Sequence, residues 1–177
     1  MRCIIDWFLV CWLRRGRYGW SKFRRWLLER KYLSIILPEV ESPEDIETSL
    51  HLITWTMDGP LHLFDCISYP QTTWAKKKDD CDGFAMVAAE LLNRLNPDYH
   101  PVLVTALVHP IRYSHTVCAL TSQEGTLWYF DNYSLKSENL EKFEDIVKSI
   151  TKEHQLVCWD VRNPFNFDMI EFHKHDE

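Results

Sequence analysis

The order of segments along this chain constrains its fold more than any other feature. Residues 80–95 carry apolar side chains at helical spacing, and Asn96-Pro97 ends that pattern. The segments expected to form strands come later, at 101–108, 114–121, 126–131 and 155–161. Because helices come first and strands follow, we expect an α+β fold in which helices pack on an antiparallel sheet.

Two further helices are expected around this central run. Ser42-Pro43-Glu44-Asp45 provides a hydroxyl cap, a proline at the first position and acids in the first turn. The inward face of this helix is expected to be Ile46, Leu50, Ile53 and Met57, with Asp58-Gly59-Pro60 at its end. Residues 61–79 are expected to be mostly loop, and apolar residues between 140 and 150 mark a third helix.

Length and charge limit the kinds of protein this can be. A chain of 177 residues suits one domain with a substantial core, and 46% apolar residues argue against disorder. Residues 1–31 hold nine Lys/Arg and two Asp/Glu, whereas the other 146 hold eleven and twenty-four. The acidic body argues against nucleic acid as its ligand.

The cysteines and the N-terminus bear on the compartment. Six cysteines occur without a C-x-x-C pair, so neither a zinc ribbon nor a dithiol redox motif is supported. Residues 3–13 are apolar apart from Asp6, but the run is too short to span a bilayer. Its basic residues follow it, and no small-residue cleavage site is present. We expect a retained N-terminus and reduced thiols in the cytoplasm.

Residues 1–37 differ in character from the expected domain at 38–177. They form a basic arm with apolar residues at helical spacing, which Gly16 and Gly19 are expected to break into two segments. Basic residues beside Trp and Leu suit an amphipathic helix on an anionic membrane surface. Packing of the arm on the acidic domain, or on a partner protein, explains the pattern equally well. Both interpretations place the contact within residues 1–33, and the first adds membrane association to the cytoplasmic location.

Three polar residues fall where they can act together. Cys81 begins the helix at 80–95, His115 begins a strand, and Asp131 ends the next strand. A hairpin pairs these two strands, so alternation places His115 and Asp131 on one side as cross-strand neighbours. Asp80, as the cap of the helix, opposes ionisation of the thiol, so a nearby imidazolium is needed. The pattern therefore predicts a thiol nucleophile, a histidine base and an aspartate that orients the base.

These segments resemble the transglutaminase-like superfamily of papain-related cysteine proteinases, in particular its small bacterial and phage-type members. The matching stretches are Asp79-Asp80-Cys81-Asp82-Gly83-Phe84-Ala85, His115-Thr116-Val117-Cys118-Ala119 and Trp128-Tyr129-Phe130-Asp131, within residues 42–135. Asp79 stands where the family usually has glycine. The resemblance implies a transglutaminase-like fold with Cys81 as nucleophile, His115 as base and Asp131 as orienting acid.

The resemblance also implies an oxyanion hole, made by the Cys81 backbone N–H and an upstream donor. Gln71 and Trp74 can both supply that donor, and the sequence leaves the choice open. The implied reaction is acyl transfer through a thioester, most simply hydrolysis of a protein or peptide substrate as a cysteine peptidase or amidase, without metal or organic cofactor. Transamidation or deamidation of glutamine side chains is the alternative within the family. The non-enzymatic alternative is a catalytically silent protein-binding module.

The remaining candidate residues are assigned to structure. Cys66, Cys118 and Cys158 are expected to be buried packing residues. Asp82 and Glu90 are expected on the solvated face of the helix. His100 and His109 could replace His115, but neither has the strand and acid that accompany it. His173-Lys174-His175 resembles a metal-binding tract, but two histidines at the end of an acidic tail are expected to be solvated.

Overall fold

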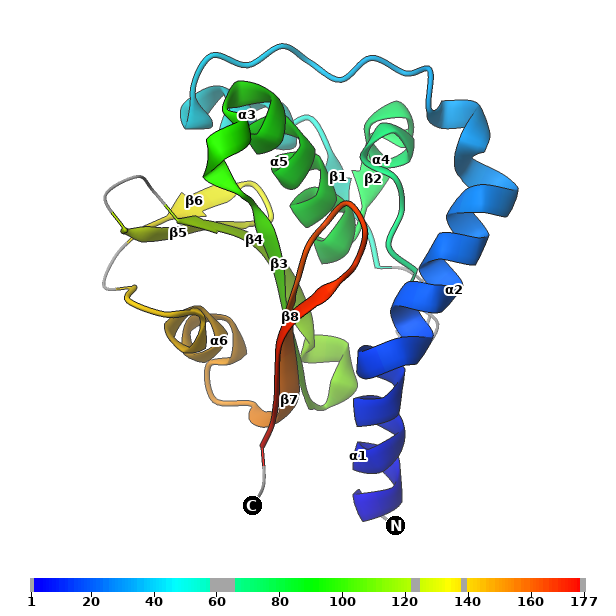
Figure 1. The fold of residues 1–177 in the computed structure, drawn as a ribbon, viewed down its shortest axis with the longest axis vertical. Coiled ribbons are helices and arrows are strands. Elements are labelled where there is room, and N and C mark those ends of the chain that lie inside the picture. The colour runs from blue at the N-terminus through cyan, green and yellow to red at the C-terminus, as the bar shows by residue number, and fades with distance from the viewer. Residues whose placement is uncertain (1, 58–65, 122–124, 138–139, 176–177) are drawn as a thin grey trace.

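A six-stranded antiparallel sheet forms the centre of the protein in a computed structural model that describes residues 2–57, 66–121, 125–137 and 140–175 (Figure 1). Its strand order is β6-β5-β4-β3-β7-β8. The strands are β3 (Val102–His109), β4 (His115–Thr121), β5 (Leu127–Asp131), β6 (Ser134–Lys136), β7 (Gln155–Arg162) and β8 (Met169–Lys174). The expected α+β class with an antiparallel sheet is confirmed.

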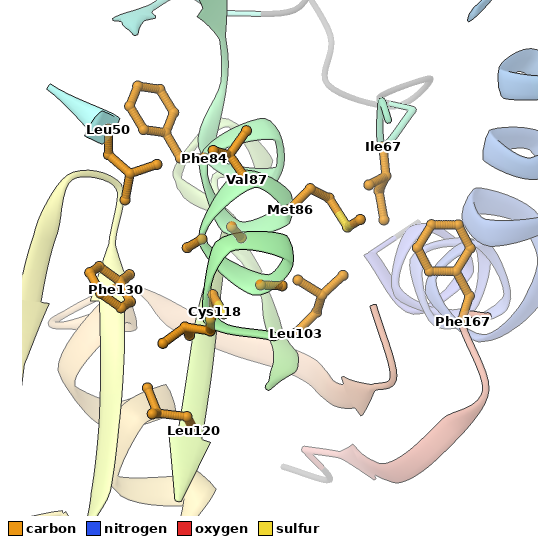
Figure 2. Close-up of a cluster of buried hydrophobic side chains, with 14 of the residues drawn as sticks. Leu50, Ile67, Phe84, Met86, Val87, Leu103, Cys118, Leu120, Phe130 and Phe167 are labelled. Atoms are coloured by element: carbon orange, nitrogen blue, oxygen red, sulfur yellow. The ribbon is translucent and has the colours of Figure 1, made fainter. Parts of the chain in front are cut away.

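Helices cover both faces of this sheet. On one face, α5 (Cys81–Leu95) buries its apolar stripe in the main core, as Figure 2 shows around Phe84, Met86 and Val87. The sheet contributes Leu103, Cys118, Leu120 and Phe130 to this core. On the other face, α6 (Phe143–Thr151) packs on a second cluster with Val104, Val117, Ala119 and Tyr129. Because both faces are covered, burial along β4 is continuous from Thr116 to Leu120, and its apolar side chains enter the two clusters alternately.

The smaller elements lie beside α5. They are α3 (Pro43–Leu50), α4 (Pro70–Lys76), and the parallel pair β1 (Thr54–Trp55) and β2 (Lys78–Asp79). Short 3₁₀ turns follow α5 and β3, at η4 (Pro97–Tyr99) and η5 (Ile111–Tyr113).

The expected helices were found with two corrections. Ser42 caps α3 as expected, since its side chain accepts a hydrogen bond from the Asp45 N–H. That helix ends at Leu50, however, and Met57 is exposed rather than part of its inward face. The expected loop at 61–79 contains α4, which begins with Pro70 at its first position. The predicted end at Asp58-Gly59-Pro60 lies outside the described residues.

The N-terminal helix runs along one flank of the molecule, in blue at the right of Figure 1. It comprises α1 (Arg2–Cys11), the π-helical turn η1 (Trp12–Gly16), α2 (Arg17–Arg24), the π-helical turn η2 (Arg25–Glu29) and the 3₁₀ turn η3 (Arg30–Tyr32). The expected break at Gly16 and Gly19 was therefore wrong. Gly16 has helical backbone angles, and a Cβ there would overlap the ring of Trp12.

One buried stripe of this helix follows a strict four-residue spacing. Its members are Leu9, Leu13, Arg17, Ser21, Arg25 and Glu29, each 5% exposed or less. In a regular α-helix, residues four apart drift by about 40° around the axis at each step, so such a stripe would turn away from the domain. The wider turns η1 and η2 accommodate more residues per turn and oppose that drift.

Polar groups of the stripe attach the helix to the segment before α4. The hydroxyl of Ser21 accepts a hydrogen bond from the Ile67 N–H, and Arg25 donates to the carbonyl oxygens of Ile67 and Ser68. The buried carboxylate of Glu29 accepts from Ser68, from the Tyr69 N–H and from Thr72. The helix therefore packs on the body of the protein, while the division into units at 1–37 and 38–177 stays a prediction. None of the helices in the described part of the chain is long and apolar enough to cross a membrane.

Candidate active site

Cys81 is the first residue of α5, and its side chain is partly exposed. Asp80 precedes it as the N-cap, where Oδ1 accepts a hydrogen bond from the Asp82 N–H at 3.3 Å. The predicted cap is confirmed. The thiol thus stands at a helix N-terminus, where the backbone supplies unpaired N–H groups and partial positive charge.

His115 and Asp131 meet at one end of the sheet. His115 Nε2 lies 2.8 Å from Asp131 Oδ1, and both side chains are only partly exposed. The β4–β5 register pairs Cys118 with Phe130, so its continuation sets Asp131 opposite Val117. His115 is then a diagonal neighbour on the same face, close enough for long side chains to touch. The expected neighbour relationship is confirmed.

Cys81 and His115 line the same small cavity, which has a volume of about 40 Å³. Burial lowers the pKa of His115, but the negative charge of Cys81 and hydrogen bonds to Asp131 and Cys81 raise it to about 10. The ring is therefore an imidazolium at neutral pH, with both nitrogens as donors. With Nε2 occupied by Asp131, Nδ1 is the nitrogen left for the thiol.

Asp131 is suited to hold this imidazolium. The hydrogen bond from His115 lowers the pKa of the Asp131 carboxyl, against partial burial that acts in the opposite direction. The group is thus a carboxylate at neutral pH, where His115 is charged. It fixes the ring orientation and balances its charge.

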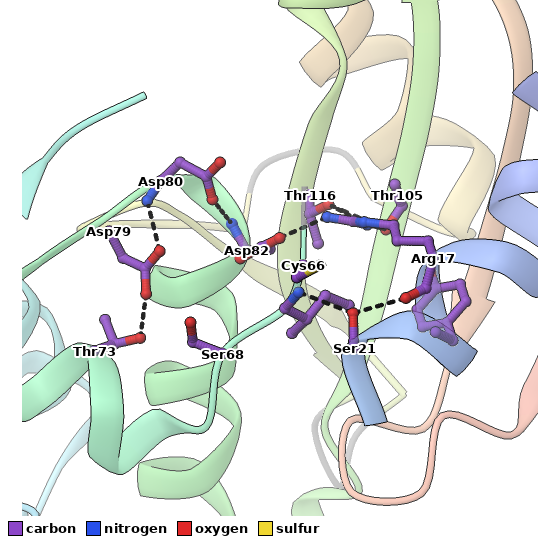
Figure 3. Close-up of polar contacts among 12 residues, drawn as sticks. Arg17, Ser21, Cys66, Ser68, Thr73, Asp79, Asp80, Asp82, Thr105 and Thr116 are labelled. Carbon is purple, nitrogen blue, oxygen red and sulfur yellow. Dashed lines mark hydrogen bonds and ion pairs between the residues drawn. The ribbon is translucent and has the colours of Figure 1, made fainter. Parts of the chain in front are cut away.

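The N-terminal helix forms one wall of the cavity. Leu9, Trp12 and Arg17 line it together with residues of β3, β4 and the turn before β4. Arg17 Nη2 lies 2.7 Å from Oδ2 of Asp82, the residue that follows Cys81 in the sequence. Figure 3 shows the guanidinium of Arg17 beside Thr105 and Thr116. A segment far away in sequence therefore limits access to Cys81.

The position of Asp82 corrects the sequence interpretation. It was expected on the solvated face, whereas the structure buries it completely beside Arg17. Sequence reasoning also missed Trp12 and Arg17 as wall residues. The four-residue spacing from Leu9 to Arg17 was the available signal, but a buried arginine breaks an apolar pattern and hides it. Glu90 is partly buried and pairs with Arg94 at 2.9 Å.

The turn before Cys81 is built around Asp79. Its carboxylate accepts hydrogen bonds from the Thr73 hydroxyl and the Asp80 N–H, which joins α4 to the start of α5 (Figure 3). Gly83 packs directly against this carboxyl, and a Cβ there would overlap it. The carboxyl of Asp79 is thus accommodated by a glycine four residues later.

The acidic residues around the thiol could also be considered as metal ligands. Carboxylate oxygens of Asp79, Asp80 and Asp82 lie within 4.8 Å of one another. However, Arg17 already provides a positive charge to Asp82, and Thr73 donates to Asp79. Two of the three carboxylates therefore have partners within the protein, one of them a positive charge.

The two candidate oxyanion donors lie on α4. Gln71 and Trp74 are both partly buried, and Trp74 packs against the main core. Neither belongs to the described residues that line the cavity with Cys81 and His115. The oxyanion role of either residue stays a prediction.

Other residues considered from sequence have structural surroundings. Cys66, Cys118 and Cys158 are buried, as expected. His109 does have an acid partner, contrary to expectation, because its Nε2 lies 2.6 Å from Asp6 Oδ1 of the N-terminal helix. It does not line the described cavity.

Comparisons with known proteins found limited likeness. No protein-family model matches the chain, and no curated protein matches it. Among solved structures, calcium-bound LapG of Legionella pneumophila is similar at 14% identity and a TM-score of 0.47, covering 66% of this chain and 62% of that one. EGTA-treated LapG gives 13% identity and 0.48, covering 76% and 66%. Similarity at this level carries no residue roles to this chain.

Proposed function

We propose that this protein is a thiol-dependent acyl-transfer enzyme of the transglutaminase-like superfamily, acting as a cysteine peptidase or amidase. The observation that carries the proposal is the position of His115, which contacts Asp131 through Nε2 and shares a cavity with Cys81. This arrangement supports roles for Cys81 as nucleophile, His115 as base and Asp131 as orienting acid.

Acylation begins from the ion pair of thiolate and imidazolium. The Cys81 sulfur attacks the carbonyl carbon of an amide, and the carbonyl oxygen takes up negative charge. His115 then donates its Nδ1 proton to the leaving nitrogen, so the C–N bond breaks and an amine departs. The products of this half-reaction are a thioester on Cys81 and a neutral imidazole.

Deacylation reverses the direction of proton transfer. The neutral His115 takes a proton from water as the water oxygen attacks the thioester carbonyl. The C–S bond breaks, the carboxylic acid leaves, and the ion pair is restored. An amine in place of water would give transamidation by the same steps, and a glutamine side chain as acyl donor would give deamidation. Asp131 stays ionised throughout and balances the positive charge of the imidazolium.

Negative charge on the carbonyl oxygen requires donors near Cys81. The Cys81 backbone N–H, in the first turn of α5, is the first candidate. Gln71 and Trp74 are the proposed second donors, since α4 packs on α5. Gln71→Ala and Trp74→Phe separate them: loss of a donor that binds only the transition state lowers kcat with little change in KM.

A simple acyl donor tests the proposal without knowledge of the substrate. We expect p-nitrophenyl acetate to release nitrophenol in a burst and to leave one acetyl group on Cys81, detected by intact-mass and peptide mass spectrometry. Cys81→Ala and His115→Gln should abolish this burst, whereas Cys11→Ser, at an exposed cysteine, should retain it. An equal burst from Cys81→Ala would refute the nucleophile. Acylation of wild type that is resistant to hydroxylamine would refute a thioester.

A further inference from the structure

The outer face of the N-terminal helix carries large exposed apolar side chains that belong to neither described core cluster. They include Trp7, Phe8, Trp20, Phe23, Trp26, Leu27 and Leu28, with exposed fractions between 47% and 66%. Trp20, Phe23 and Trp26 form a continuous row, with ring centroids 5.6 and 6.2 Å apart. A row of this size is unusual on a free protein surface and marks a contact site.

The exposed charges on this helix share one sign. Its exposed charged residues among those described are all cationic, namely Arg14, Arg15, Lys22, Arg30 and Lys31. Its two acids face the domain instead, where Asp6 pairs with His109 and Glu29 is buried against Ser68 and Thr72. The outer face is therefore apolar and positively charged, with no acid to offset it.

We propose that this outer face binds an anionic lipid bilayer, with the helix lying parallel to the membrane surface. Aromatic and leucine side chains would enter the region between headgroups and acyl chains, and the interleaved cations would contact anionic headgroups. Figure 1 shows the rest of the protein on the other side of the helix, so a flat surface can approach along its length. The acidic body is then held away from the anionic surface.

Other partners fit this face less well. A second copy of the chain would bring two basic surfaces together, which opposes self-association. Nucleic acid would match the cations and stack on the aromatic rings, but it offers nothing to Leu27 and Leu28. The acidic body would also repel it. A bilayer satisfies the charge and the aliphatic side chains together.

Sedimentation with large vesicles tests the proposal on the full chain. We expect binding to phosphatidylcholine vesicles that contain phosphatidylserine, and little binding to phosphatidylcholine alone. Raising salt should weaken the binding, because screening shortens the reach of exposed charges. Binding of equal strength to both vesicle types, or to neither, would overturn the proposal.

Matched variants assign the contact to this face. Trp20 and Trp55 are 48% and 47% exposed, but only Trp20 lies on the N-terminal helix. We expect Trp20→Ser to lower partitioning about fivefold, while Trp55→Ser leaves it unchanged. Lys22→Glu should also lower it by about fivefold or more, whereas Lys136→Glu, on β6, should not. Equal losses within either pair would place the contact elsewhere.

Two controls exclude trivial outcomes. Thermal unfolding of each variant checks that the fold is kept, and Trp26→Ser replaces Trp20→Ser if the latter unfolds. Sedimentation velocity without lipid tests self-association. A dimer that Trp20→Ser dissociates, together with absent vesicle binding, would assign the face to a second copy and refute the membrane. The acetylation burst of Cys81 is measured separately, so failure of one proposal does not decide the other.

Discussion

Arg17 Nη2 lies 2.7 Å from Asp82 Oδ2, and the two side chains are only 5% and 1% exposed. This ion pair joins the N-terminal helix to the first turn of α5, next to Cys81. It brings together residues 65 positions apart, and Arg17 also contacts the hydroxyls of Thr105 and Thr116 at the sheet. The same buried contact thus stabilises the fold and holds the N-terminal helix beside Cys81.

Arg17→Met should destabilise the protein by about 3–5 kcal/mol, because it leaves the Asp82 carboxylate buried without its cation. Urea unfolding measures this change. Arg17→Met combined with Asp82→Asn should recover part of the loss, since no buried charge then remains. Lys142→Met removes an exposed pair with Glu144 and should have little effect. Comparable losses from Arg17→Met and Lys142→Met would contradict the buried-pair account.

Cys81 should react with iodoacetamide about tenfold faster than Cys11 near neutral pH. An imidazolium next to a thiol increases its reactivity toward electrophiles, and the lower nucleophilicity of stabilised thiolates offsets part of the gain. Cys11 is exposed and therefore controls for access. Rates come from peptide mass spectrometry, and His115→Ala should remove the difference. Equal rates in the wild type would exclude the ion pair.

Trp12→Ala should open the cavity from the side of the N-terminal helix. We expect bulky maleimides to label Cys81 several-fold faster in this variant, while iodoacetamide labelling changes little, since the wall limits size more than reactivity. Trp20→Ala, on the outer face of the same helix, is the matched control. An increase of the same size with iodoacetamide would mean that Trp12 affects the thiol itself rather than access.

Asp131→Asn should lower the pKa of His115 from its raised value of about 10. The variant removes the charge of Asp131 and weakens a hydrogen bond, both of which favour the imidazolium against burial. Titration of the His115 ring by NMR checks this, with Asp98→Asn as an exposed control. An unchanged titration in Asp131→Asn would contradict the assigned role.

The same raised pKa links stability to pH. The folded value of His115 lies above the ordinary value of about 6.5 expected in the unfolded chain. The stabilisation is therefore complete below about pH 6.5 and is lost as pH rises through about 10. Urea unfolding over this range should show a smaller loss in His115→Gln than in wild type.

Gly83→Ala and Gly19→Ala should have opposite effects on stability. A methyl group at Gly83 would overlap the buried Asp79 carboxyl, and such overpacking costs about 1–3 kcal/mol. Nothing lies within 4 Å of a Cβ at Gly19 in α2, so alanine there should stabilise by about 1 kcal/mol. Thermal unfolding distinguishes them, and a loss at Gly19 would indicate an unseen contact on that face.

The central part of the fold was predictable because its signals were local. The helix beginning at Cys81, its cap and the β4–β5 hairpin follow from capping and alternation, and the same alternation led to the His115–Asp131 contact. By contrast, β8 was missed since it lies at the sheet edge with little burial on either side. A strand that hides no face leaves no two-residue period in the sequence.

The relation between the N-terminal helix and the site could not be predicted in the same way. Its outer face carries large apolar side chains, whereas its inner face carries several charged ones. The rule that apolar residues face the core would therefore assign the two faces the wrong way round. The inner face holds Arg17, Arg25 and Glu29, whose partners lie on distant segments. Only the three-dimensional arrangement reveals those partners, and with them the burial of Asp82.

The connection between η3 and α3, residues 33–42, begins with a turn and then runs without helix or strand across the top of the molecule in Figure 1. The contacts of Arg17, Arg25 and Glu29 hold the helix independently of this connection. A cut within it would therefore yield two associated pieces rather than a shortened chain. A synthetic peptide of residues 1–33 could then bind to a fragment that lacks these residues. The wall of the cavity would thus become a separate subunit whose presence the experimenter controls.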